Sequence, residues 1–194
     1  MKINVMPGRV LVKKHEAKLK GSIMLPPSRK KMYEIGEVVS NGRLEKFGQD
    51  GKFSTAETYA PGDLVLFTLP NFMAPGITFD IKKVDHCFLN AGDIVAKLST
   101  DTIEINSFKI TGVYMLLLPD LRYEGAILLP GAAEEAKKEH LHFSVLQCGR
   151  DVKEEFYQGQ EVFPDKGRVN PLSIDGKDYV FVDYQFVYGS LSID

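Results

Sequence analysis

The sequence predicts an all-β chain built from two small barrels in tandem, and three observations support this prediction. Apolar residues come in short runs separated by Gly, Pro and Asn turns, which is the pattern of short strands. Blocks of the first half recur in the same order in the second half. Helical periodicity is nearly absent. The 194 residues suffice for one large domain or two small ones, and many short strands in a unit of roughly 90 residues are typical of a small barrel.

The predicted strands are short and rich in β-branched or aromatic residues. Val10–Val12 precede a charged break, and Val38 and Val39 lie between Gly36 and an Asn-Gly turn. Leu64–Phe67 and Tyr179–Val187 contain Val, Phe and Tyr in high proportion. The exception is "GAAEEAKKEH" at residues 131–140, whose alanines and Glu-to-Lys spacing of four favour a helix. An isolated helix of that length is marginal in water.

The internal repeat is clearest when Gly21 is aligned with Gly125. The same alignment then pairs Ile23 with Ile127, Leu25 with Leu129, Pro26 with Pro130, Gly8 with Gly112 and Val12 with Leu116. With small shifts, residues 36–43 match 143–150, 60–67 match 157–163, and 85–98 match 178–191. We therefore predict one domain over residues 1–100 and a second over 101–194, joined near the polar stretch 99–107.

The stretch "GSIMLPPSRKK" at residues 21–31 places three large apolar residues between a glycine and two prolines. The surrounding residues 13–31 are rich in lysine and poor in aromatic residues, so we expect this segment to be mobile and the trio to be exposed. The prolines and the basic residues oppose strand pairing and aggregation. This arrangement favours an arm that docks apolar side chains in a partner's groove. "GAILLPG" at residues 125–131 repeats it.

A single arm of this kind should bind weakly. Burying the trio removes ~300 Å² from water, or roughly 7 kcal/mol at ~25 cal/mol/Å². Ordering the segment costs roughly 2–5 kcal/mol, and loss of rigid-body freedom costs more. Several arms on one assembly would add avidity without new contacts. The alternative is that both trios are ordinary inward-facing strand residues, but their recurrence in a matching context favours the arm.

Composition and motifs argue against several function classes. The net charge of −2 gives no global attraction to nucleic acid or to an anionic membrane, and the apolar run Val113–Leu118 is too short to span a bilayer. The N-terminus lacks the apolar segment of a signal peptide. Cys87 and Cys148 are expected to be free thiols, and no Cys-x-x-Cys pair indicates a zinc site. Beyond the close pair His140 and His142, histidines lack ligand spacing. Neither a phosphate-binding loop nor a nucleophile elbow is found.

The ordered blocks resemble the co-chaperonin family, the GroES or chaperonin-10 group. The resemblance is carried by "INVMPGRVLVKKHEAKLKGSIMLPPSRKKMYEIGEVVSNGR", by "PGDLVLF" and "AGDIVAKL", and in the second half by "IDGKDYVFVDYQFVYG". It implies two GroES-like irregular β-barrels with long mobile loops. It also implies a ring of copies that caps a GroEL-type chaperonin and encloses an unfolded substrate protein. ATP would be bound and hydrolysed by the chaperonin, so the cap would be no enzyme and carry no cofactor.

The resemblance also assigns the binding residues. The loop tripeptides would bind a groove between two helices of the chaperonin's apical domain, with glycines as pivots. The predicted chaperonin-binding residues are Ile23, Met24, Leu25, Ile127, Leu128 and Leu129, and the predicted pivots are Gly21 and Gly125. We expect the first arm to be the more conventional and the stronger one.

The second half departs from the family pattern in two places. Arg43–Gly62 would form the family's roof hairpin, whereas the matching span 150–159 is shorter, so we expect the dome to be built mainly by the first half. Leu116–Leu118 replace the charged strand end of the first half and are expected to pack the two domains together.

Two rival functions remain at this stage. One is a structural ring or scaffold protein that keeps the barrels without binding a chaperonin, which predicts rigid loops at Gly21 and Gly125. The other, an enzyme with a GroES-like barrel as in zinc alcohol dehydrogenases, is disfavoured because the dinucleotide domain and the zinc ligands are missing. Tandem co-chaperonins occur in chloroplasts, but without a transit-like segment the expected location is the cytoplasm, including that of a phage-infected bacterium. The sequence leaves open whether one barrel per chain or both form the ring.

Overall fold

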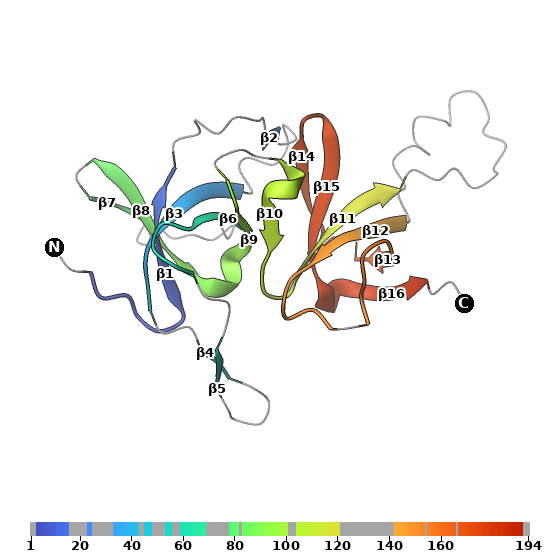
Figure 1. Ribbon diagram of the computed structural model, residues 1–194, viewed down its shortest axis with the longest axis horizontal. Coiled ribbons are helices and arrows are strands. Elements are labelled where there is room, and N and C mark those ends of the chain that lie inside the picture. The colour runs from blue at the N-terminus through green and yellow to red at the C-terminus, as the bar shows by residue number, and fades with distance from the viewer. Residues whose placement is uncertain are drawn as a thin grey trace.

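The computed structural model shows two β-sheet bodies side by side (Figure 1), each formed mostly by one half of the chain. The residues that the structure describes are 3–15, 23–24, 33–42, 45–47, 53–55, 59–68, 78–81, 83–100, 104–120, 142–153, 155–165 and 167–191. The all-β prediction is confirmed, because the regular elements of these ranges are strands and short 3₁₀ turns.

The first sheet has seven strands in the order β10-β9-β6-β3-β1-β8-β7. In chain order these are β1 (Arg9–Lys14), β3 (Tyr33–Asn41), β6 (Leu64–Thr68), β7 (Thr78–Ile81), β8 (Val84–Asn90), β9 (Ile94–Leu98) and β10 (Phe108–Ile110). The 3₁₀ turns η2 (Ala91–Asp93) and η3 (Ile105–Ser107) precede β9 and β10. All pairs in this sheet are antiparallel.

The second sheet also has seven strands, in the order β16-β13-β12-β11-β15-β14-β2. They are β2 (Ile23–Met24), β11 (Tyr114–Asp120), β12 (His142–Cys148), β13 (Glu161–Pro164), β14 (Asn170–Ile174), β15 (Lys177–Asp183) and β16 (Val187–Leu191). The 3₁₀ turn η4 (Tyr184–Phe186) precedes β16.

Six strands of each sheet correspond one to one. The order β9-β6-β3-β1-β8-β7 in the first sheet equals β16-β13-β12-β11-β15-β14 in the second. Each sheet then adds one strand from the other half of the chain: β10 joins β9, and β2 joins β14. The two sheets thus confirm the tandem barrel-like architecture. The exact boundaries at residues 100 and 101 stay a prediction, and β10 joins the first sheet from beyond them.

The turn before the third shared strand shows how closely the halves repeat. Gly62 and Gly159 both have positive φ, at 94° and 85°, which favours glycine. Asp63 accepts a side-chain hydrogen bond from the amide of Ala60, and Gln160 accepts the equivalent bond from Tyr157. The weak sequence match of residues 60–67 with 157–163 is therefore a true structural equivalence.

The first shared strand corrects the sequence alignment by one position. Arg9 pairs with Asn90 on β8, and Tyr114 pairs with Asp183 on β15, so β11 is one residue out of step with the predicted match. Leu116 therefore corresponds to Leu11 rather than to Val12. The turns before the two strands have the same length, since the amide of Arg9 donates to the carbonyl of Met6 and that of Tyr114 to the carbonyl of Thr111. The positive-φ glycine is the third residue of the first turn (Gly8) but the second residue of the other (Gly112), so aligning the two glycines shifts the strands by one residue.

Three apolar clusters hold the two sheets. One belongs to the first half and one to the second. The third joins the halves and contains Tyr33, Ile35, Leu66, Val95, Ala96, Leu98, Phe108, Ile110, Leu116, Leu172, Ile174, Tyr179 and Phe181. The expected packing role of Leu116–Leu118 is right for Leu116 alone, since Leu117 lies in the second core and Leu118 is exposed. Strand alternation sends neighbouring side chains to opposite faces.

The predicted roof region contains a two-stranded hairpin, β4 (Glu45–Phe47) with β5 (Phe53–Thr55), which extends away from both sheets (Figure 1). In the second half, the described residues between β12 and β13 contain no strand. The predicted helix at residues 131–140 lies outside the described residues.

Candidate binding and assembly edges

The structure places two of the predicted chaperonin-binding residues. Ile23 and Met24 form β2 and pair in antiparallel register with Ile174 and Ser173 on β14. Their backbone thus has the strand conformation of the alternative considered above. The other predicted binding residues and both pivots lie outside the described residues: Gly21, Leu25, Gly125, Ile127, Leu128 and Leu129. The binding role of all eight stays a prediction.

The bases of both predicted arms are built alike. In the first half, Lys14 at the end of β1 lies opposite Gly36 on β3, and its ammonium is 3.0 Å from a carboxylate oxygen of Glu34. In the second half, Asp120 at the end of β11 lies opposite His142 on β12. Because neighbouring strands lie about 5 Å apart, each arm leaves and re-enters its sheet at one place.

The junction between the halves is a β-ladder that continues the first sheet. Phe108 pairs with Leu98, and Ile110 pairs with Ala96. The exposed fractions of Phe108 and Ile110 are only 3% and 4%. The Thr111 hydroxyl donates to the carbonyl of Ile94 at 2.7 Å. The C-terminal strand of one barrel therefore binds the N-terminal strand of the next.

The two outer ends of the chain, residues 3–6 and β16, are the equivalents of β10 and β9, but neither has such a partner in the described structure. By the turn that precedes β1 and β11, Met6 corresponds to Thr111, yet Met6 is 71% exposed and Thr111 is 0% exposed. Tyr188 on β16 corresponds to Val95 on β9, and its exposed fraction is 79% against 0%. β16 ends its sheet. Sequence reasoning missed this pair of edges, although the alternating apolar residues Ile3 and Val5 match Phe108 and Ile110 and contain the signal.

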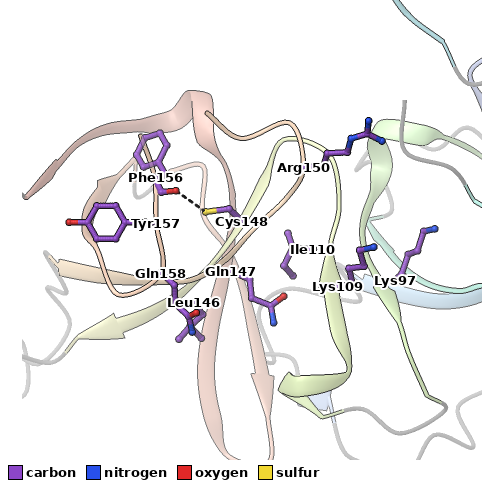
Figure 2. Close-up of a pocket in the computed structure, with 10 residues that line it drawn as sticks. All are labelled: Lys97, Lys109, Ile110, Leu146, Gln147, Cys148, Arg150, Phe156, Tyr157 and Gln158. Atoms are coloured by element: carbon purple, nitrogen blue, oxygen red, sulfur yellow. Dashed lines mark hydrogen bonds between the residues drawn. The ribbon is translucent and has the colours of Figure 1, made fainter. Parts of the chain in front are cut away.

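A pocket of about 580 Å³ lies beside the junction (Figure 2), lined by β9, β10, β12 and the segment that follows β12. Lys109 and Arg150 line one part, and Phe156 and Tyr157 line another. Among the described residues, the side chains around it include no carboxylate.

The two cysteines are free and protonated at neutral pH. Burial raises the pKa of the Cys87 thiol to about 11, and burial also raises that of Cys148, whose thiol lies 4.0 Å from the carbonyl of Phe156. A thiol with a raised pKa is a poor nucleophile and a poor metal ligand. Within the described ranges, no group of His, Cys, Asp and Glu residues could hold a metal ion. No described helix is long and apolar enough to cross a membrane.

Comparison with known families gives one match. Residues 2–98 match the family described as Cpn10, Chaperonin 10 Kd subunit. No curated protein matches the chain. The matched range covers β1 to β9, which are the six shared strands of the first half, the hairpin β4–β5 and β2.

Proposed function

Because the chain belongs to the Cpn10 family, whose members are co-chaperonins rather than enzymes, we propose that it caps an ATP-driven chaperonin ring of the GroEL type. The tripeptides Ile23–Leu25 and Ile127–Leu129 would bind the chaperonin's apical domains, and the cap would enclose an unfolded substrate protein in the cytoplasm. The observation that carries this proposal is the family match over residues 2–98. The second sheet adds support, because it repeats the strand order of the matched half.

The junction offers a template for the ring. In this proposal, residues 3–6 of one chain pair with β16 of the next, as β10 pairs with β9 inside the chain. Met6 and Tyr188 would then be covered, as their counterparts Thr111 and Val95 are. Both barrels of each chain would stand in one ring, so the ring would hold an even number of barrels.

Edge strands normally carry protection against such pairing. β16 has little of this protection, because none of its five residues is charged and the side chains of Tyr188 and Leu191 are exposed. The hairpin β4–β5 of the first half would point toward the dome. Alternate barrels would therefore contribute to the roof, and this asymmetry is visible by electron microscopy.

ATP-dependent co-sedimentation with a purified GroEL-type chaperonin tests the proposal. The wild type should sediment with the chaperonin when ATP is present, and Ile23→Asp should bind several-fold more weakly because a charge cannot enter an apolar groove without a partner. Val39→Asp is the matched control, since Val39 is an exposed apolar residue outside both arms. If the wild type sediments to the same extent with and without ATP, and Ile23→Asp binds as strongly as the wild type, the scaffold function is favoured instead.

A further inference from the structure

We propose that the free edge of β14 is an internal docking site for the first tripeptide, so that Ile23–Met24 rests on the second barrel until a partner takes it. The docking itself is independent of the proposed function. A chaperonin that binds the tripeptide would have to displace it from β14, so docking would compete with chaperonin binding. This second part of the inference rests on the proposed function.

The pairing of β2 with β14 carries this inference. Met24 lies opposite Ser173, and Ile23 lies opposite Ile174. Without β2, β14 would be the last strand of its sheet. Its counterpart in the first half, β7, ends the first sheet and pairs with β8 alone in the described structure. The second barrel thus holds a strand that the first barrel supplies, as Figure 1 shows at the upper side of β14.

The hairpin that contains β14 determines which backbone groups face β2. Asp175 and Gly176 have φ of 50° and 76°, the signature of a two-residue type I′ turn. In such a hairpin the flanking pair, here Ile174 and Lys177, exchanges hydrogen bonds. Alternation then directs the backbone N–H and C=O of Ser173 away from β15 and toward β2. Pro171 shares this outward side, where its missing N–H is tolerated.

Tyr33, which follows the tripeptide in the chain, is held against β14 and β15 and so keeps the tripeptide within reach of β14. Tyr33, where β3 begins, donates a hydrogen bond from its hydroxyl to the carbonyl of Asn170 on β14 at 3.0 Å. Its ring also lies 5.6 Å from that of Phe181 on β15. Tyr33 follows Met24 by nine positions, a tether with a reach of roughly 30 Å. Ser173 is three residues from Asn170, or roughly 10 Å along the strand. Nine residues are therefore long enough to connect Tyr33 at Asn170 with Met24 at Ser173.

A two-residue strand gives a weak and reversible contact. One or two backbone hydrogen bonds of ordinary strength correspond to a change of roughly threefold to tenfold in an equilibrium constant. A partner that takes Ile23–Leu25 from this position binds with an affinity lowered by the undocked fraction. Loss of the docking site should therefore strengthen chaperonin binding by about the same factor.

Amide exchange in the free, full-length chain tests the docking. The amide of Met24, directed at Ser173, should exchange more slowly than that of Ile23, which points away from β14. Ser173→Pro removes the N–H that donates to the carbonyl of Met24, so the docking is weakened and the Met24 amide, which donates to the retained carbonyl of residue 173, should lose protection by roughly threefold to tenfold. Ser173→Ala keeps both backbone groups and should preserve the protection. Equal exchange rates at Ile23 and Met24 in the wild type would overturn the proposal.

A second measurement does not depend on how well Ser173→Pro folds. Met24→Cys combined with Ser173→Cys should form a disulfide within one chain under mild oxidation, because directly opposed residues bring their Cβ atoms close enough. Met24→Cys combined with Ser144→Cys on β12 is the control for random encounter. Equal yields in the two variants would also overturn the docking.

The affinities of the Ser173→Pro and Ser173→Ala variants for the chaperonin test the docking and the proposed function separately. Ser173→Pro binding roughly threefold to tenfold more tightly than Ser173→Ala supports a resting position that competes with the chaperonin. Equal affinities overturn that competition. If neither variant binds a chaperonin but Met24 is protected, the docking stands and the proposed function fails.

Discussion

The inner and outer edges of the two sheets are made from equivalent strands but have different surroundings. At the junction, β9 accepts β10, and the side chains of Val95 and Thr111 are both 0% exposed. At the ends of the chain, the corresponding side chains Tyr188 and Met6 are 79% and 71% exposed. Apolar residues persist at the outer positions although a monomer gains nothing by exposing them. The comparison supports the proposal that the outer edges are contact surfaces for a second copy of the chain.

The largest effect should come from a charge at the inner edge. Ile110→Asp buries an unpaired carboxylate in the cluster that joins the halves, and we expect a loss of about 3–5 kcal/mol in the free energy of unfolding. Val5→Asp is the equivalent change at the outer edge, where Val5 is only half-buried, and should cost about 1 kcal/mol. Chemical denaturation below the concentration of assembly measures both. Similar losses in the free energy of unfolding would contradict the inference that the inner edge is covered and the outer edge is open.

A smaller effect should distinguish the two predicted arms. Deleting Ile23–Leu25 should weaken chaperonin binding more than deleting Ile127–Leu129, because the first arm has the basic flanks and the family match. We expect losses of roughly tenfold or more for the first deletion and several-fold for the second, since the remaining arms keep part of the avidity. Binding isotherms with ATP give the ratio. Equal losses would contradict the ranking of the arms.

Alkaline pH should weaken the junction. Burial, with smaller contributions from Asp93 and Asp183, raises the pKa of Tyr114 to about 12, and burial raises that of Tyr33 well above its usual 10.0. The unfolded chain therefore loses these protons first, so stability is full below pH 10 and falls as pH rises toward 12. Tyr114→Phe should reduce this pH slope, whereas the exposed Tyr157→Phe should keep it. An unchanged slope in Tyr114→Phe would exclude this cause.

Much of the fold could be predicted from the sequence because its signals are local. Short apolar runs and positive-φ glycines mark the strands and turns in both halves, and the match of residues 60–67 with 157–163 is a true equivalence. The alignment failed by one position at β11, because the positive-φ glycines Gly8 and Gly112 occupy different positions of two turns of equal length. Matching the glycines in the sequence cannot detect this difference in turn geometry.

The candidate site was less accessible to sequence reasoning. The apolar trio at residues 23–25 is visible as an oddity of composition, but the pairing of Met24 with Ser173 joins positions far apart in the chain. Leu116–Leu118 illustrate the same limit, because alternate faces of one strand send them to different clusters or to solvent. Long-range partners depend on the topology of both sheets, which no single segment encodes.

The most direct test of the central claim is a disulfide between two chains. Ile110 pairs with Ala96 inside the chain, so its counterpart Val5 in one copy should lie opposite Gly189 of another, where an added Cβ would meet no atom within 4 Å. A chain with Val5→Cys, mixed with a chain that carries Gly189→Cys, should give a covalent heterodimer under mild oxidation that neither variant gives alone. A mixture that stays monomeric under oxidation would contradict the assembly of this chain through its outer edges.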